Sequence, residues 1–195
     1  TGAVGEAMLE LLASRDFPVG ELTLLASERS AGTRLPCKEK SLTVKDLAHF
    51  DFAGIDIAMF SAGGDVSADY APKAAAAGCV VIDNTSHFRR DEDIPLIIPE
   101  VNLHALDGYK ARNIIANPNC STIQMLVALK PIMDAAGLSR INVATYQAVS
   151  GAGKSGIEEL AGQSAKLLIA QDIEPEVFGK QIAFNAVPHI DDFQD

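Results

Sequence analysis

The sequence predicts an α/β protein in which a doubly wound parallel sheet is followed by the beginning of an α+β domain. From Thr1 to about Asn117, helical and strand patterns alternate, as expected when helices cover both faces of a parallel sheet. The largely apolar residues 55–60 have the composition of a buried strand. After Asn119 the pattern changes to a long helix followed by a strongly alternating segment, residues 141–149, which indicates a strand of a different, larger sheet.

The individual elements follow from the spacing of apolar side chains. Between Val4 and Leu12 these side chains fall on one helical face, so the chain opens with an amphipathic helix. We place a domain boundary near Pro118, which gives a first domain at residues 1–118 and the first part of a second at 119–195. The other predicted elements are strands at residues 21–26, 41–44, 55–60, 79–82, 96–98, 113–116 and 141–149, helices at 68–77, 121–136 and 156–170, and loops with short strands at 171–195.

The composition is typical of a globular protein and argues against a polyanionic partner. The chain has 195 residues, of which 48% are hydrophobic and 22% charged, enough for a sizeable core. Its formal charge of -10 would repel nucleic acid and anionic membranes over most of the surface. No apolar run reaches the roughly 18 residues that span a bilayer, and no signal-peptide pattern occurs at the start. We therefore expect a cytoplasmic protein.

A glycine turn opens the first helix. Residues 1–5 read Thr-Gly-Ala-Val-Gly, and glycines there let the backbone approach a pyrophosphate while the N–H groups of the helix end meet its charge. An ordinary helix start with two glycines fits these residues nearly as well. Because such a turn usually follows a strand and none precedes Thr1, we expect an incomplete chain, and residues 191–195 suggest the same for the other end.

The end of the first predicted strand favours NADP over NAD. About 20 residues after the glycine turn, an NAD site usually carries an acidic residue that binds the ribose hydroxyls. Here Ser27, Glu28, Arg29 and Ser30 occupy that place, and an arginine between hydroxyls suits a 2′-phosphate instead. Glu28 opposes this interpretation, and a solvated polar loop is the alternative. A second tight turn, Ser-Ala-Gly-Gly at residues 61–64, follows another strand at the edge where ligands bind in this architecture, with a plain strand-to-helix turn as the alternative.

Cys120 lies at the start of the long predicted helix. A thiolate at a helix N-terminus is stabilised by the helix dipole and the unpaired N–H groups, which makes the cysteine a nucleophile. An equally good interpretation of the spacing is that Asn119 or Ser121 caps the helix and Cys120 fills a gap. The other cysteines, Cys37 and Cys79, lie far away in sequence, and the spacing predicts neither a disulfide nor a metal site. Cys79 begins an apolar strand pattern and is expected to be buried.

Several motifs occur in order along the chain. They are Asp-Asn-Thr-Ser-His-Phe-Arg at residues 83–89, Pro-Glu-Val-Asn at 99–102, Asn-Pro-Asn-Cys-Ser-Thr at 117–122 and Tyr-Gln-Ala-Val-Ser-Gly-Ala-Gly at 146–153. In this order they closely resemble the bacterial type of aspartate-semialdehyde dehydrogenase, over essentially the whole chain. The resemblance implies that a Rossmann-type NADP-binding domain is followed by a catalytic and dimerisation domain, and that the protein forms a homodimer.

The resemblance also implies roles for individual residues. Cys120 would be the nucleophile, and Gln147 the side chain that orients the substrate. Arg89 and Asn119 would bind phosphate, although the neighbouring Arg90 looks equally suitable without the family pattern. Contacts to NADP would come from Thr1, Gly2, Ala3, Val4, Arg29, Ser30, Ser150 and Gly151.

The reaction that the resemblance implies passes through a cysteine thioester. The thiolate attacks aspartate semialdehyde, NADP takes up a hydride, and phosphate releases aspartyl phosphate; the biosynthesis of lysine, threonine and methionine runs these steps backwards. The histidine base and the substrate-binding arginine of the family are expected beyond Asp195. Two alternatives remain, N-acetyl-glutamyl-phosphate reductase and a non-catalytic paralogue that keeps the nucleotide-binding fold. The first usually has Gly and Tyr where this chain has Asn119 and Ser121.

Overall fold

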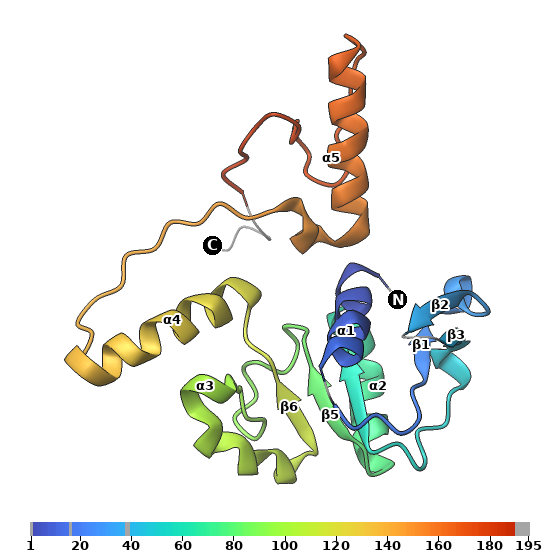
Figure 1. Cartoon of the computed structure of the whole chain (residues 1–195), viewed down its shortest axis with the longest axis vertical. Helices are drawn as coiled ribbons and strands as arrows, with labels where there is room; N and C mark the ends of the chain where they lie inside the picture. Colours follow the sequence, from blue (N-terminus) through green and yellow to red (C-terminus); the bar gives the residue numbers. More distant parts are fainter. Residues whose placement is uncertain (1, 16, 38–39, 190–195) are drawn as a thin grey trace. The chain divides into compact units, whose positions relative to one another are not determined.

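The computed structural model of the chain divides into two compact units, and Figure 1 labels most of their helices and strands. One unit is Glu21–Ile141, and the other combines Thr1–Gly20 with Asn142–Asp195. Within the described ranges, no helix has the length and apolar content needed to span a bilayer. The structure describes residues 2–15, 17–37 and 40–189.

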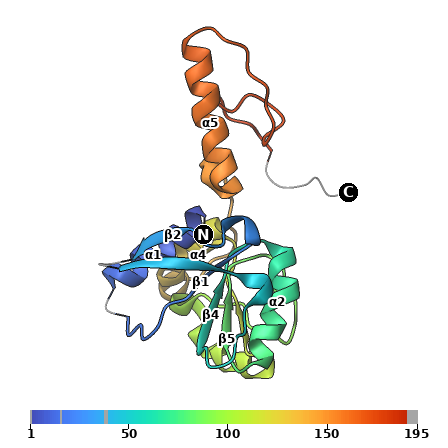
Figure 2. The same ribbon diagram turned by 90° about the vertical axis from the view of Figure 1, so that its right-hand side faces the viewer.

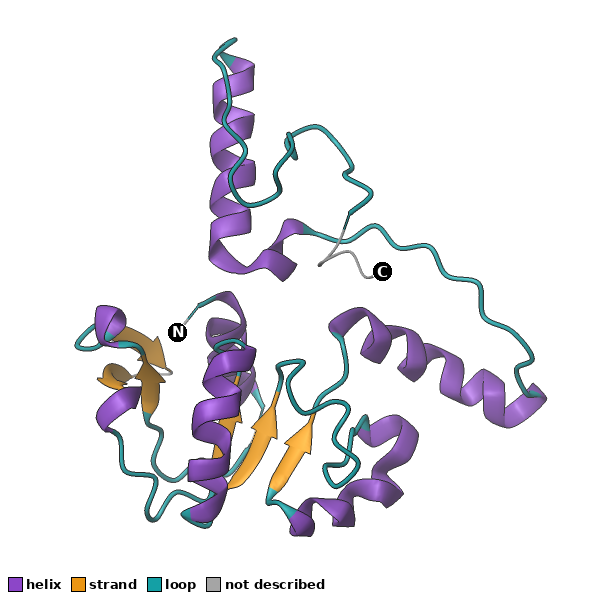
Figure 3. Cartoon of the chain, turned by 180° about the vertical axis from the view of Figure 1, so that it is seen from behind, coloured by secondary structure: helices purple, strands orange, loops and turns teal. Residues whose placement is uncertain are grey.

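A three-stranded parallel sheet forms the centre of the unit Glu21–Ile141. Its strands are β4 (Ile57–Phe60), β5 (Val80–Asp83) and β6 (Ile114–Ala116), in the order β4-β5-β6. The labelled β4 and β5 lie side by side in Figure 2, and all three strands are orange in Figure 3. The last residues of the three strands pair in register. The predicted parallel sheet is therefore confirmed, and its carboxyl ends form one edge.

The helix α2 (Gly64–Ala76) connects β4 to β5, as expected for parallel neighbours that need a crossover. It lies beside these two strands in Figure 2. Ala71 and Ala74 are fully buried on its inner side. These small side chains let the helix approach the sheet closely. The predicted helix at residues 68–77 is confirmed, with a start four residues earlier.

Residues 96–98, predicted as a strand, form only an isolated bridge from Leu96 to Ala116. Asn102 explains this difference, because its side chain takes up backbone groups that a strand would use. Its Oδ1 accepts from the backbone N–H of Ile98 at 2.9 Å, and its Nδ2 donates to the carbonyl of Leu96 at 2.9 Å. The chain then continues in two helices that lead to β6, α3 (Pro99–Asn102) and the 3-10 helix η3 (Leu103–Ala111).

A second, smaller sheet in the same unit has the order β1-β3-β2. β1 (Leu24–Ala26) runs parallel to β3 (Lys40–Asp46), and β2 (Arg34–Cys37) is antiparallel to β3. The predicted strands at the positions of β1 and β3 are confirmed, whereas β2 lies in a stretch for which no strand was predicted. Pro36 weakens its strand pattern, yet a proline is tolerated at the edge of a sheet, where β2 lies.

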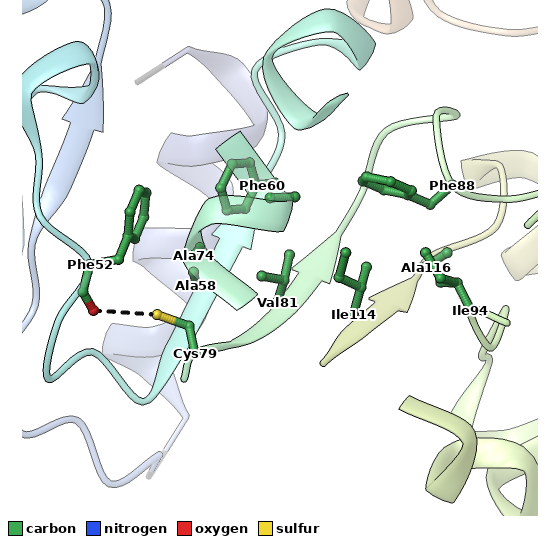
Figure 4. Close-up of a cluster of buried hydrophobic side chains, with 11 residues drawn as sticks. Phe52, Ala58, Phe60, Ala74, Cys79, Val81, Phe88, Ile94, Ile114 and Ala116 are labelled. Atoms are coloured by element: carbon green, nitrogen blue, oxygen red, sulfur yellow. Dashed lines mark hydrogen bonds between the residues drawn. The ribbon is translucent and has the colours of Figure 1, made fainter. Parts of the chain in front are cut away.

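The hydrophobic core of this unit is built on the side chains of the parallel sheet. Phe60, Val81 and Ile114 contribute one side chain from each strand, and each is at most 6% exposed (Figure 4). Cys79 is fully buried, and its thiol donates to the carbonyl oxygen of Phe52 at 3.6 Å. Burial raises the pKa of the Cys79 thiol. The prediction that Cys79 is a small buried residue is confirmed.

The long predicted helix is α4 (Cys120–Ala136), which follows β6 after three intervening residues. Its first turn is capped by the side chain of Asn119. It ends at Gly137, whose φ of 73° lies in the left-handed region that glycine adopts without strain. The cap at Asn119 and the stop at Gly137 are therefore both signals that the sequence alone contains.

The other unit contains the helices α1 (Ala3–Ser14) and α5 (Gly153–Leu168), with the short 3-10 helix η4 (Val149–Ala152) just before α5. Both long helices match predictions. The chain after α5 returns to this helix (Figure 2), because Gln163, buried on α5, accepts the backbone N–H groups of residues 182 and 183 at 2.9 and 3.2 Å.

The strand predicted at residues 141–149 is wrong. Residues 141–148 have no regular secondary structure, and all of their side chains are exposed. An alternating pattern makes a strand only where a neighbouring strand takes up its backbone N–H and C=O groups. No such neighbour lies among the described residues.

Candidate active site

Three polar residues directly follow the three parallel strands. Ser61 comes after β4, Asn84 after β5 and Asn117 after β6. The amide of Asn117 donates from Nδ2 to Oδ1 of Asn84 at 3.4 Å, and Nδ2 of Asn84 donates to Oγ of Ser61 at 3.3 Å. This row of side chains lies where ligands bind in open α/β sheets. The sequence placed the turn that begins at Ser61 at this edge but assigned no role to Asn84 or Asn117, although a polar residue after each strand was a recognisable signal.

Arg89 is held at this edge by two backbone carbonyls. Its Nε donates to the carbonyl of Asn117 at 2.8 Å, and its Nη2 donates to that of Asn84 at 3.3 Å. The side chain is half-buried, and a guanidinium has further N–H donors that an anion can accept. Arg90, by contrast, is exposed and has no hydrogen bond within the described part of the chain. The structure therefore distinguishes two arginines that looked alike in the sequence.

Cys120 is the first residue of α4 and is exposed. Asn119 caps the helix, because its Oδ1 accepts from the backbone N–H of Ser121 at 3.0 Å and from that of Thr122 at 3.3 Å. Capping by Asn119 and a reactive Cys120 are compatible, since the cap uses the oxygen of the amide and leaves the thiol uncovered. The carbonyl of Asn117, which Arg89 binds, lies three residues before this thiol.

The glycine turn precedes α1 in the other unit. Gly2 has a φ of 111°, which favours glycine, and apart from its chain neighbours no atom of the described residues lies within 4 Å of the position that a Cβ would take. Ala3 and Val4 form the first turn of α1. An open glycine before a helix N-terminus fits a phosphate group, which could approach the backbone N–H groups closely. Thr1 lies outside the described residues.

Arg29 and Ser30 form the 3-10 helix η1 (Glu28–Ser30) together with Glu28, two residues after the end of β1. Arg29 is exposed, and Ser30 is half-buried. The turn is closed by backbone bonds, among them one from the N–H of Ser30 to the carbonyl of Ser27 at 2.9 Å. An arginine at the end of a parallel strand can reach a phosphate without losing a buried partner.

Gln147 belongs to the exposed stretch before η4. Its Nε2 donates to Oγ1 of Thr145 at 3.2 Å, which leaves its amide oxygen as an acceptor. Ser150 and Gly151 are exposed in η4, and the N–H of Gly151 donates to the carbonyl of Ala148 at 3.4 Å. These three predicted site residues belong to the same unit as the glycine turn, whereas the cysteine and both phosphate-binding candidates belong to the unit of the parallel sheet.

Two family profiles match the chain in tandem. The NAD-binding domain of semialdehyde dehydrogenases matches residues 1–109, and the dimerisation domain of the same family matches residues 129–195. The two matches leave residues 110–128 between them, which include β6, the Asn-Pro-Asn-Cys motif and the start of α4.

Known proteins agree with this assignment over the whole chain. Aspartate-semialdehyde dehydrogenase 2 of Vibrio cholerae is 63% identical over all 195 residues, and aspartate-semialdehyde dehydrogenase of Bacillus subtilis is 52% identical. The crystal structure of the Vibrio cholerae enzyme II complexed with ASA has a TM-score of 0.98 at 62% identity, and covers all of this chain. A structure from Candida albicans with NADP covers 71% of this chain and 46% of that one, with a TM-score of 0.58 at 28% identity.

This chain spans 58% of the length of the Vibrio cholerae and Bacillus subtilis enzymes. The match to the NAD-binding domain alone extends over more than half of its residues, and the dimerisation domain follows in the expected order. The chain therefore belongs to the semialdehyde dehydrogenase family.

Proposed function

We propose that this protein acts as an aspartate-semialdehyde dehydrogenase. It would reduce aspartyl phosphate to aspartate semialdehyde and phosphate with NADPH, reversibly, in the biosynthesis of lysine, threonine and methionine. The observation that carries the proposal is the exposed thiol of Cys120 at the first residue of α4, close in sequence to a carbonyl that Arg89 binds. The similarity to enzymes of that name in Vibrio cholerae and Bacillus subtilis supports the choice of substrate.

Cys120 is the nucleophile in this proposal. In the oxidative direction its sulfur forms a bond to the aldehyde carbon of the substrate, and the adduct becomes a thioester when that carbon loses a hydride. An oxygen of phosphate then attacks the thioester carbon, the carbon–sulfur bond breaks, and Cys120 leaves as a thiolate with aspartyl phosphate as the product. The amide of Gln147 orients the substrate. Exposure of Cys120 is a requirement of this sequence of steps, and the thiol meets it.

Arg89 and Asn119 bind the phosphate group in this proposal. The two carbonyls fix the plane of the Arg89 guanidinium, so its remaining N–H groups have a constant direction. Asn119 uses its Oδ1 for the helix cap, which leaves its Nδ2 available to donate to an anion. Asn119 therefore offers a donor directly before Cys120, and Arg89 is held by a carbonyl three residues before Cys120.

NADP fits the residues of the glycine turn and of the strand end that follows. Residues 1–4 would hold the pyrophosphate, Arg29 and Ser30 the 2′-phosphate, and Ser150 and Gly151 the nicotinamide side. The open space at Gly2 and the exposed guanidinium of Arg29 support these roles. When bound, NADP supplies the hydride acceptor of the oxidation.

We also infer the organisation of the whole enzyme. Residues 1–118 would form the NADP-binding domain, and residues 119–195 the first part of the catalytic and dimerisation domain, which the two family matches support. A homodimer is part of this proposal, and the match of residues 129–195 to the dimerisation domain of the family supports it. Three free thiols suit the reducing cytoplasm.

The test is the reduction of NADP⁺ by the full-length protein with aspartate semialdehyde, in the presence and absence of phosphate. We expect phosphate-dependent turnover that Cys120→Ser abolishes. Cys37→Ser, which changes a half-buried cysteine in β2, serves as the matched control and should keep the rate. Equal rates for Cys120→Ser and the wild type would refute the nucleophile.

The two alternatives have their own signatures. An N-acetyl-glutamyl-phosphate reductase would turn over the N-acetylated substrate and leave aspartate semialdehyde unchanged. A non-catalytic paralogue would bind NADP without any turnover. The names of the similar enzymes do not favour either alternative.

A further inference from the structure

Asp83, the last residue of β5, has a fully buried carboxylate that no step of the proposed reaction uses. It accepts three hydrogen bonds, all from neutral donors. Oγ of Ser67, buried on α2, donates to Oδ1 at 2.7 Å, the backbone N–H of Thr85 donates to Oδ1 at 3.2 Å, and Oγ1 of Thr85 donates to Oδ2 at 2.8 Å. Burying a carboxylate is costly, so these donors are essential to it.

The same bonds hold the turn that leaves β5. Thr85 binds the carboxylate with both its N–H and its hydroxyl, and its Oγ1 also accepts from the backbone N–H of His87 at 3.3 Å. Ser67 ties Asp83 to α2, so the turn is anchored to a rigid helix and not only to its own strand. The backbone of residues 83–87 is thereby constrained at several points.

Arg89 depends on the backbone of this turn. Asn84 lies between Asp83 and Thr85, and its carbonyl accepts from Nη2 of Arg89 at 3.3 Å. The side chain of Asn84 connects to Asn117, whose carbonyl accepts from Nε of Arg89 at 2.8 Å. A rotation of the peptide at Asn84 would therefore remove one of the two bonds that set the plane of the guanidinium.

We propose that Asp83 and Thr85 are positioning residues for phosphate, because they fix the turn whose Asn84 carbonyl orients Arg89. The proposal rests on the phosphate-binding role of Arg89 given above. Neither side chain touches phosphate. Their contribution is to keep the remaining N–H groups of the guanidinium aimed in one direction before the anion arrives.

Thr85→Val is the most informative variant, because valine keeps the shape of threonine and lacks the hydroxyl. Thr85→Ser keeps the hydroxyl and should therefore bind phosphate as the wild type does. Asp83→Asn places an amide donor opposite hydrogen-bond donors, so that at least one of the three bonds is lost, and two if the nitrogen takes the place of Oδ1. Ser86→Ala, at an exposed position in the same turn, is the matched control.

The readout is the KM for phosphate and, separately, for NADP⁺ in the full-length enzyme, at a temperature where circular dichroism shows each variant to be folded. We expect Thr85→Val and Asp83→Asn to raise the KM for phosphate by about tenfold or more, since misplacement by ~1 Å can cost on the order of 100-fold. The KM for NADP⁺ should stay within about twofold, and Thr85→Ser and Ser86→Ala should resemble the wild type.

Other outcomes refute the positioning role. An unchanged KM for phosphate in folded Thr85→Val would do so. An equal increase of the KM for phosphate and the KM for NADP⁺ would also do so, because it indicates a merely structural role. Arg89→Lys in the same assay separates the two proposals. If Arg89→Lys raises the KM for phosphate and Thr85→Val does not, only the positioning role fails; if Arg89→Lys leaves it unchanged, the role of Arg89 fails as well.

Discussion

Gly156→Ala tests how closely η4 packs against α5. Gly156 is buried near the start of α5, and a Cβ at this position would lie 2.6 Å from the carbonyl oxygen of Val149. It would also lie 3.0 Å from Cβ of Ala152 and 3.2 Å from Cζ of Phe178. The first contact is the decisive one, because a backbone oxygen cannot rotate aside as a side chain can. The substitution must therefore displace η4 or the helix.

The magnitude follows from two opposing effects. Alanine is a better helix former than glycine by about 1 kcal/mol, whereas overpacking of a buried site costs about 1–3 kcal/mol. Since the obstacle is backbone, we take the upper part of that range and expect a net loss of about 1–2 kcal/mol. Gly162→Ala is the matched control on the same helix. It is exposed and has nothing within 4 Å of its Cβ, so we expect a gain of about 0.5–1 kcal/mol.

The assay is urea unfolding of both variants in the full-length protein, followed by their KM for NADP⁺. The difference between the two free energies of unfolding isolates the steric cost, because the gain in helix propensity is common to both. Displacement of η4 would also move Ser150 and Gly151, so only Gly156→Ala should raise the KM for NADP⁺. Equal stability of the two variants would refute the close packing of η4 on α5.

Three further predictions concern single side chains. Asn119→Ala removes the cap of α4 and should lower the free energy of unfolding, measured in urea, by about 1 kcal/mol. Asn119→Asp keeps the cap oxygen but loses the amide donor, so it should raise the KM for phosphate at nearly unchanged stability. Backbone N–H groups, first that of Val177, hold the pKa of Glu159 below its ordinary value of 4.5. The stability that this carboxylate contributes is therefore present above that value and lost as the pH falls through the lower native pKa, so Glu159→Gln should weaken the acid dependence of unfolding. Cys120 is exposed and should react with iodoacetamide in the native protein. Cys79 is buried, its thiol has a raised pKa, and it should react only after unfolding. Mass spectrometry of the alkylated peptides distinguishes the two.

Each of these has a control or an opposing outcome. Glu158→Gln changes an exposed neighbour on α5 whose ion pair with Lys154 is long, at 3.9 Å, so its unfolding should keep the acid dependence of the wild type. If Asn119→Asp bound phosphate as well as the wild type, the amide of Asn119 would have no part in binding. Alkylation of Cys79 at the rate of Cys120 would contradict its burial.

The four long helices of this protein were predictable from local patterns. Apolar spacing located α1, α2, α4 and α5 within a few residues, and Asn119 and Gly137 marked the ends of α4. Such signals act within one or two turns of the chain, because capping and helical periodicity involve neighbouring residues. The sequence motifs also suggested the family, which the matches to its two domains confirmed.

Strands were harder to predict, because their stability depends on partners elsewhere in the chain. Residues 141–149 alternate strongly but pair with no described strand, and residues 96–98 lose their backbone groups to Asn102. β2 was overlooked because its short pattern contains Pro36, and only pairing with β3 makes it a strand.

The sequence by itself determined the long helices and the position of Cys120 at a helix start, since each depends on the order of neighbouring residues. The parallel sheet followed less directly, from the alternation of helix and strand patterns along the chain. Only the tertiary structure decided how Arg89 differs from Arg90. Its two carbonyl partners lie 5 and 28 residues away, and they meet it because parallel strands bring their carboxyl ends to one edge. Contacts over such separations arise from packing of the sheet, which no local pattern records.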